Sequence, residues 1–280
     1  MEGTGAPSHG GPIMTLDGSR QVILAAVMQG YDNTSYGDAF ADVYDEWYGD
    51  ISDVEATVAA LATLAAAAGG LPIVELGVGT GRLAFPLAER VQPTLVIGID
   101  SSPAMLHRLA AKHAEEHADS ALQTILGDMI DDLPDGPLGV VFIAFNTFFN
   151  IGSAARQADC MRSVAQRLGP NGCLVIEAMV PEDPPRTGSL VDVKSLANDR
   201  VILSVARYDG VQQTAEGQFI EFTESGGVRL RPWSIRYAPP TELDQMAASA
   251  GLRCAERWET FAGEPFTDDS ARHVSVYRLA

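Results

Sequence analysis

The sequence predicts a doubly wound α/β fold, in which a seven-stranded sheet with an antiparallel last strand carries an antiparallel β lid inserted after its fifth strand. Short apolar runs typical of strands buried on both faces alternate with helix-length segments over residues 73–177. A glycine-rich turn follows the first run. Strand-like segments separated by turn residues then fill residues 181–238, where the inserted sheet is expected. One domain is expected over residues 21–280.

The N-terminal part of the chain is expected to be a flexible tail followed by helices. Residues 1–20 are rich in Gly, Pro and Ser, a composition typical of such tails. The apolar run at residues 22–28 is short and no cationic segment precedes it, so a signal peptide is not expected. Residues 30–70 are expected to form a helical lid, within which Ser52 and Glu55 fit a capping box that opens a helix.

Strands that alternate with helices form right-handed βαβ units, so the five apolar runs predict parallel strands. Ser102 followed by Pro103 predicts the start of the helix after the second strand. After the insert, a helix capped at Thr241 and ending at Gly251 precedes two final strands. The expected strands cover residues 73–76, 95–99, 122–126, 140–144 and 173–177, then 201–208, 217–223 and 228–237 in the insert, and finally 252–258 and 273–279.

Composition excludes several classes of protein. With 46% hydrophobic and 20% charged residues, the chain has the composition of a soluble globular protein. Its formal net charge of −18 makes nucleic acids and anionic membranes unlikely partners, because such a surface repels phosphate groups. Three widely spaced cysteines form no disulfide framework and suit a cytoplasmic location. Residues 113–117 fit the zinc pattern HxxEH, but they continue a helix that runs away from the expected binding edge, so no metal is expected.

The glycine-rich turn and the acids around it indicate a nucleotide-type cofactor. Glu75 ends the first strand, and the glycines that follow let the backbone turn tightly and approach a ligand closely. Asp100 ends the next strand, 19 residues after the last of these glycines, where a carboxylate can accept both hydroxyls of a ribose. Arg82 occupies the position at which a dinucleotide motif would have its third glycine. The glycines are Gly77, Gly79 and Gly81.

This set of residues resembles the class I S-adenosylmethionine-dependent methyltransferases, which have a Rossmann-like fold. The resemblance implies that the loop from Glu75 to Gly81 holds the methionyl part of the cofactor, S-adenosyl-L-methionine, and that Asp100 holds its ribose. It also implies that Asp128 and Met129, which follow the third strand, border the adenine. The same resemblance adds three residues to the predicted cofactor-binding set, namely Ser101, Met105 and Asn146.

The segment before the first strand resembles the N-terminal part of the amino-sugar N-methyltransferases of macrolide and lincosamide pathways. Those enzymes carry two tyrosines eight residues apart, as Tyr36 and Tyr44 are here, and the resemblance implies that both approach the transferred methyl group and the substrate. Asn150 stands where one subgroup has a histidine, and an amide cannot act as a base. Glu177, at the end of the fifth strand, is the remaining candidate base. A role in core packing is the alternative for the tyrosines, and a structural role for Glu177.

The sequence therefore predicts an enzyme that transfers a methyl group from S-adenosylmethionine to an amine or hydroxyl of a small molecule in secondary metabolism. A monomer or a homodimer is expected. Two alternatives remain open at this point: a nicotinamide-dependent oxidoreductase, and a methyltransferase-like fold that acts as a non-methylating cyclase or binding module. Basic residues in the insert favour an acceptor that is neutral or carries a carboxylate. Two roles remain open for three of them, contact with the acceptor or protection of a strand edge from pairing: Arg229, Arg231 and Arg236.

Overall fold

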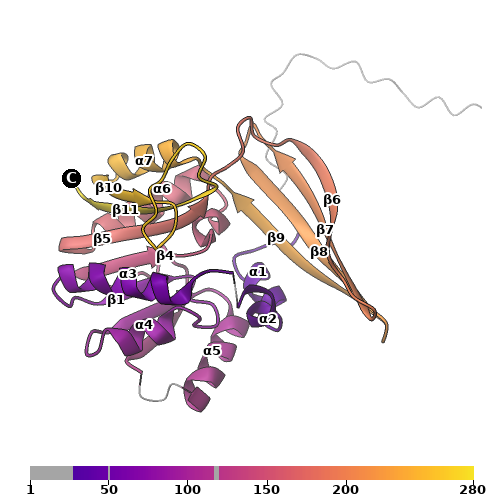
Figure 1. Cartoon of the computed structure of the whole chain (residues 1–280), viewed down its shortest axis with the longest axis horizontal. Helices are drawn as coiled ribbons and strands as arrows, with labels where there is room; N and C mark the ends of the chain where they lie inside the picture. The colour runs from indigo at the N-terminus through magenta and orange to yellow at the C-terminus, as the bar shows by residue number, and fades with distance from the viewer. Residues whose placement is uncertain (1–27, 50, 117–119) are drawn as a thin grey trace, which may run out of the picture.

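A computed structural model describes residues 28–49, 51–116 and 120–280 of the chain. The predicted tail over residues 1–20 lies outside these ranges. The described residues form a seven-stranded sheet with helices on both faces, and a four-stranded sheet that extends away from it (Figure 1). No helix in the described ranges is long and apolar enough to cross a membrane.

The seven-stranded sheet has the order β10-β11-β5-β4-β1-β2-β3. Neighbouring strands run parallel except at β11, which is antiparallel to both β5 and β10. The predicted doubly wound fold with an antiparallel last strand is thereby confirmed. The strands are β1 (Ile73–Leu76), β2 (Val96–Asp100), β3 (Leu122–Leu126), β4 (Leu138–Ile143), β5 (Leu168–Met179), β10 (Leu252–Trp258) and β11 (Arg272–Leu279).

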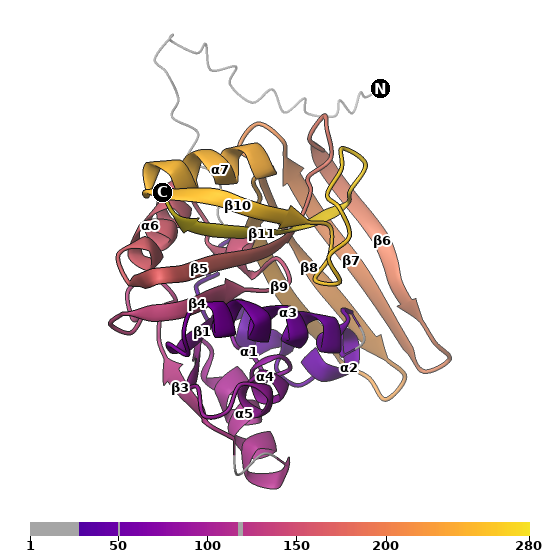
Figure 2. The same ribbon diagram turned by 60° about the vertical axis from the view of Figure 1, so that its left-hand side comes forward.

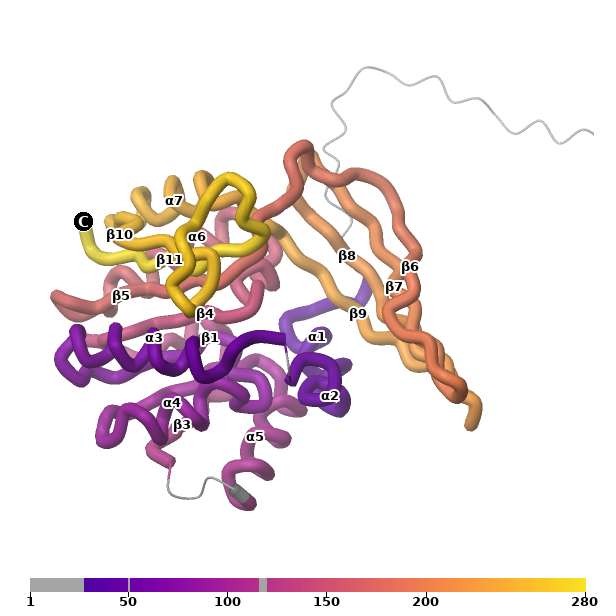
Figure 3. Tube along the Cα trace, in the orientation of Figure 1, coloured from indigo at the N-terminus to yellow at the C-terminus, as the bar shows by residue number. Residues whose placement is uncertain are grey.

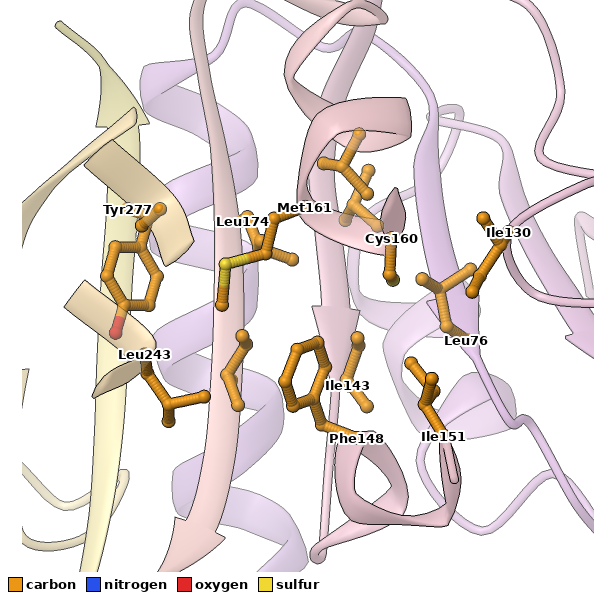
Figure 4. Packing of buried hydrophobic residues seen from close by; sticks show 14 of the residues in the cluster. Leu76, Ile130, Ile143, Phe148, Ile151, Cys160, Met161, Leu174, Leu243 and Tyr277 are labelled. Atoms are coloured by element: carbon orange, nitrogen blue, oxygen red, sulfur yellow. The ribbon is translucent and has the colours of Figure 1, made fainter. Parts of the chain in front are cut away.

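Helices cover the two faces of this sheet because β1 and β4 are buried at every position and need apolar cover on both sides (Figure 2). One core cluster joins the sheet to α6 and α7, and Figure 4 shows part of it, with Leu76, Ile143, Cys160 and Leu174 packed together. The other cluster joins the sheet to α3, α4 and α5. The helices are α3 (Val54–Ala67), α4 (Ala84–Arg90), α5 (Pro103–Glu116), α6 (Ala154–Ala165) and α7 (Pro240–Ser249).

Two of the predicted helix starts are wrong by one or two residues. The residue that caps α3 is Asp53, whose side chain accepts from the amide of Ala56, and not Ser52. Helix α7 begins at Pro240, which suits the first turn because proline has no N–H to satisfy there. Thr241 therefore lies inside the helix. The predicted cap of α5 is confirmed, since Ser102 Oγ accepts from the amide of Met105 at 3.1 Å.

The inserted sheet has four antiparallel strands in the order β6-β7-β8-β9. Its predicted strands correspond to β7 (Arg200–Asp209), β8 (Thr214–Thr223) and β9 (Val228–Arg236), whereas β6 (Gly188–Leu196) was not predicted. Strand β6 is an exposed edge strand, and its polar residues interrupt the apolar run that would reveal a strand in the sequence.

Two short helices, α1 (Ser35–Phe40) and α2 (Tyr44–Tyr48), lie between the carboxyl edge of the large sheet and the inserted sheet (Figures 1 and 3). The rings of Phe40 and Trp47 meet Phe219 of β8 edge-on, at centroid distances of 5.9 and 5.7 Å. The side of the inserted sheet that carries Phe219 thus packs on α1 and α2. These helices cover the edge at which an α/β sheet binds ligands.

Candidate active site

A cavity of about 280 Å³ lies at the carboxyl ends of β1, β2 and β3, under α1 and α2. It brings together ten residues that the sequence predicted, from segments far apart in the chain. These ten are Tyr36, Tyr44, Gly77, Gly79, Asp100, Ser101, Met105, Asp128, Met129 and Asn150. The other four predicted residues do not line this cavity. They are Glu75, Gly81, Asn146 and Glu177.

The glycine loop after β1 needs glycine for different reasons at each position. The φ angles of Gly77, Gly79 and Gly81 are 77°, 55° and 84°, a region that side chains disfavour. A Cβ at Gly77 would lie 2.4 Å from Cγ2 of Thr147, and one at Gly81 would lie 2.5 Å from the ring of Phe85. At Gly79 the nearest atom would be 3.9 Å away, so this backbone faces open space on the cavity side. Gly81 thus serves packing, while Gly79 leaves room for a ligand.

Asp100 is fixed in place by the backbone around it. Its carboxylate accepts from the amide of Gly79 at 2.8 Å and from the amide of Ser102 at 2.9 Å. Burial nevertheless raises the pKa of this carboxyl group. The side chain lines the cavity. A carboxylate held in this way presents its remaining lone pairs to hydroxyl groups of a ligand, as the ribose prediction requires.

Glu75 lies behind the loop rather than in the cavity wall. It is 4% exposed, and its Oε2 has no hydrogen-bond partner among the described residues. Burial raises its pKa to about 8, and the nearby Asp100 adds to this. A buried acid with an unpaired oxygen is costly unless a cation or a donor approaches it. The ammonium group of a methionyl moiety has that chemistry, so this residue fits the predicted cofactor.

Replacing Glu75 by Gln is expected to remove a loss of stability that develops as the pH rises from about 4.3 to about 8. Because the folded-state pKa is about 8 and the ordinary value about 4.3, the folded chain binds more protons than the unfolded chain between these values. The free energy of unfolding therefore falls as the pH rises through this window, and the variant should show a smaller fall. Urea unfolding of both chains at a series of pH values measures this difference. Equal slopes would contradict the buried-acid assignment.

The far end of the cavity is polar on one side and apolar on the other. Met129 and Ile130 line it together with Asp128. Arg156, which the sequence did not reveal, reaches this end from α6 and pairs with Asp128 at 3.2 Å and with Asp131 at 2.8 Å. Apolar side chains beside a polar pair suit an adenine ring, which has flat faces and polar edges.

Residues just before α1 form part of the cavity wall and were also missed. Tyr31, Asp32 and Asn33 line it, and the hydroxyl of Ser101 donates to the backbone oxygen of Asn33 at 2.7 Å. Ser234 of β9 lines the same cavity. The inserted sheet therefore contributes directly to the site. None of these residues belongs to a local motif, so only the folded structure reveals them.

The two predicted tyrosines lie in the cavity wall as neutral phenols. Burial raises the pKa of Tyr36 and of Tyr44 well above the ordinary value for a phenol. Tyr48 interacts with Tyr36, and its ring lies 5.0 Å from that of Tyr44. Neither tyrosine can serve as a base near neutral pH. Both can orient groups by hydrogen bonding and exclude water.

Replacing Tyr36 or Tyr44 by Phe is expected to lower turnover by roughly tenfold, the value of one lost hydrogen bond. The ring and its packing remain, so the melting temperature should change little. Steady-state rates and thermal unfolding of the same preparations measure both quantities. A fall in melting temperature with unchanged activity per folded molecule would instead assign these residues to the core.

A second cavity, of about 300 Å³, lies at the ends of β4 and β5 and is lined by Phe145, Asn146 and Glu177 among others. Phe145 and Asn146 have φ angles of 50° and 62°, an uncommon conformation for residues other than glycine. Glu177 accepts from the amide of Phe145 at 2.8 Å, and the side-chain oxygen of Asn146 accepts from the amide of Met179 at 2.6 Å. Asn146 thus joins the ends of two strands and does not line the first cavity. Burial raises the pKa of Glu177.

Three arginines that were expected either to contact an acceptor or to protect a strand edge instead pair with residues of the chain. Arg231 is 1% exposed and bonds Asp42 at 2.6 Å and Glu221 at 3.1 Å. Arg229 also pairs with Asp42, while Arg236 is buried against other residues. None of the three lines either cavity. They hold the insert against α1 and against the body of the fold. The partners of Arg236 are Gln157, Gln213 and Glu242.

The HxxEH pattern does not form a recognisable metal centre in the described ranges. The ring of His113 stacks on Phe85 at a centroid distance of 6.0 Å, and His117 lies outside the described residues. Within the part of the chain that the structure describes, no three His, Cys, Asp or Glu side chains are grouped as metal ligands would be.

Comparisons with known proteins agree with this geometry. A family profile described as a methyltransferase domain matches residues 73–172, whereas a search of curated proteins gave no match. Among solved structures, the CcbJ methyltransferase from Streptomyces caelestis is 42% identical, with a TM-score of 0.80 over 89% of this chain and 100% of that one. The sugar N-methyltransferase KedS8 from a Streptoalloteichus species is 22% identical, with a TM-score of 0.62 over 89% of this chain and 98% of that one.

A methyltransferase from Clostridium acetobutylicum shares the fold at 12% identity, with a TM-score of 0.73 over 86% of this chain and 98% of that one. The 42% identity to CcbJ over its whole length exceeds what a shared fold alone requires. Together with the domain match and the glycine loop, it establishes the family and supports neither an oxidoreductase nor a zinc enzyme. The chain belongs to the class I S-adenosylmethionine-dependent methyltransferases.

Proposed function

We propose that the protein methylates a nitrogen atom of a small molecule in natural-product metabolism. The observation that carries this proposal is that three polar side chains of the first cavity cannot take a proton near neutral pH, since the phenols of Tyr36 and Tyr44 stay neutral and Asn150 is an amide. The carboxylate of Asp100 in the same wall is assigned to the ribose. An amine attacks through its lone pair once deprotonated, whereas a hydroxyl group needs a base. The likeness to the sugar N-methyltransferase KedS8 in fold supports the same choice.

When bound, S-adenosylmethionine supplies an electrophilic methyl group on a sulfonium cation. The described residues fit its parts. Asp100 supplies hydrogen-bond acceptors and Glu75 a buried oxygen without a partner, Gly79 leaves space beside the backbone, and Met129 with Asp128 provides a site for the adenine. In this arrangement Asp100 holds the ribose, and Glu75 accepts from the amino group. Carboxylates also suit the positive charge of the ligand.

The chain's contribution to the reaction is alignment and the exclusion of water. Such positioning supplies up to about 7–11 kcal/mol in favourable cases. Tyr36 and Tyr44 lie on the lid side of the cavity, and their hydroxyls are the polar groups there that can orient an acceptor amine. The ring of Tyr48 contacts those of Tyr44, which lines the first cavity, and Phe145, which lines the second, at centroid distances of 5.0 and 5.8 Å, so the two cavities are neighbours here. We assign the second cavity to the acceptor.

Glu177 is the ionisable side chain that would face an acceptor in that cavity. It is 8% exposed, and one of its oxygens is taken by the amide of Phe145. Its other oxygen can accept from an amino or hydroxyl group of the acceptor. For an amine this contact orients the substrate, whereas for a hydroxyl group the same carboxylate would have to take the proton.

Two measurements test the proposal. Calorimetric titration with S-adenosylhomocysteine is expected to show binding at one site per chain, and no binding would contradict it. Incubation with S-adenosylmethionine and panels of amino sugars, phenols and carboxylic acids should give a one-methyl mass increase with the amines. If phenols react and Glu177→Gln abolishes their methylation, the acceptor atom is oxygen and the proposed N-methylation is wrong.

A further inference from the structure

The carboxylate of Asp128 is held so that one of its two oxygens is left for a ligand. Its Oδ1 accepts from the amides of Ile130 and Asp131, at 2.9 and 3.2 Å, and from Nη2 of Arg156 at 3.2 Å. Its Oδ2 has one contact among the described residues, with the side-chain amide of Asn33, which donates to it at 3.3 Å. That bond is long and exposed, so a group of a ligand can replace it.

The backbone of Asn33 is fixed in the wall of the first cavity by contacts on both sides. Its carbonyl oxygen accepts from Oγ of Ser101 at 2.7 Å. The preceding residue, Asp32, accepts from the amides of Thr34 and Ser35, both at 3.0 Å, and so closes the turn that leads into α1. Together with the side-chain contact to the carboxylate, these bonds place Asn33 between the segments that follow β2 and β3. Its side chain is thereby aimed at the end of the cavity assigned to the adenine.

The edge of an adenine ring needs a donor beside an acceptor. It presents the hydrogens of its amino group and, next to them, a ring nitrogen that accepts. A carboxylate such as that of Asp128 can take a hydrogen but cannot donate to the nitrogen. Arg156 has donors at this end of the cavity, but they are directed to Asp128 and Asp131. The amide of Asn33 carries the matching pair, an oxygen that accepts and an NH₂ group that donates, and asparagine pairs with adenine in this way.

We propose that the side chain of Asn33 recognises the adenine of the cofactor. When the base binds, Asn33 releases Oδ2 of Asp128, which then accepts one hydrogen of the amino group. The amide oxygen of Asn33 accepts the other hydrogen, and its NH₂ group donates to the adjacent ring nitrogen. The segment before α1 thus determines which base the site accepts. This inference concerns the cofactor alone, so it goes beyond the proposed function and does not depend on which atom of the acceptor is methylated.

Asn33→Ala is expected to bind S-adenosylhomocysteine about tenfold more weakly than the wild-type chain, the value of one two-bond contact to a base. The bond to Ser101 uses the backbone oxygen, which the variant keeps, so the melting temperature should change little. Asn171→Ala is the matched control, and its affinity should equal that of the wild-type chain. Asn171 is also exposed and contacts the chain through its backbone oxygen, but it lies outside both cavities.

The contact to the ring is tested with two analogues of S-adenosylhomocysteine, in which C–H replaces one of the ring nitrogens beside the amino group, N1 or N7. Calorimetric titration should show that the wild-type chain binds at least one analogue about tenfold more weakly than S-adenosylhomocysteine. Asn33→Ala should bind that analogue and S-adenosylhomocysteine equally. The inference is wrong if Asn33→Ala keeps the wild-type affinity or distinguishes the analogues as strongly as the wild-type chain does. A wild-type chain that distinguishes neither analogue would also overturn it.

Discussion

Asp100→Ala is expected to weaken the binding of S-adenosylhomocysteine by about 10²–10⁴-fold. Charge-assisted hydrogen bonds are worth about 1.5–3 kcal/mol each, and the carboxylate is assigned two to the ribose. The variant also leaves the amides of Gly79 and Ser102 without their acceptor, so the glycine loop loses an anchor. Calorimetric titration gives the affinity, and circular dichroism checks the fold of the same sample.

Two further variants separate the ribose contact from the loop anchor. Asp100→Asn keeps an oxygen that can accept from the amide of Gly79, so the loop should stay in place while binding still weakens. Asp159→Ala removes an exposed carboxylate that pairs with Arg162 on α6, and binding should not change. Unaltered affinity in a folded Asp100→Ala chain would show that this residue does not hold the cofactor.

Gly79→Val is expected to abolish cofactor binding, because the branched side chain would occupy the cavity that the backbone leaves open. No protein atom lies closer than 3.9 Å to the Cβ position, so the fold has room for the side chain and only the ligand would meet it. The φ of 55° adds strain of about 1–2 kcal/mol. A lower melting temperature is therefore expected as well.

Gly69→Val is the matched control for this strain. Gly69 has a φ of 78° with open space around its Cβ position, and it lies in the connection between α3 and β1, outside both cavities. Both variants should lose similar stability in thermal unfolding, but only Gly79→Val should lose binding of S-adenosylhomocysteine. Equal loss of binding in the two chains would mean that strain, and not occupation of the cavity, explains the effect.

The cofactor side of the site could be predicted because its geometry is local. A glycine turn after one strand and an acid at the end of the next lie together in any sheet of this type, so Gly79 and Asp100 follow from spacing alone. Tyr31, Arg156 and Ser234 could not be found in this way. They belong to three distant segments, and only packing brings them to one cavity.

The errors have equally definite causes. Asn146 follows β4 as predicted, but position at a strand end does not say where a side chain points, and this one turns to the amide of Met179. The insert arginines suggested an acceptor that is neutral or carries a carboxylate, because their own acidic partners, such as Asp42 for Arg231, are far away in the sequence. In a chain with 37 acidic residues, internal pairing was the competing explanation.

The pair formed by Asp42 and Arg231 also sets an order of events in the assembly of the molecule. The two residues are separated by 189 positions, so their contact closes a loop of most of the chain, at an entropic cost that local contacts do not carry. During synthesis, the segment that bears Tyr36 and Tyr44 emerges first but must wait for β9 before it meets its partner. Strands β1 to β4 are complete before then. The part of the fold that contains β1 to β4 can thus form on a nascent chain before the inserted sheet is in place to hold α1 and α2 over it.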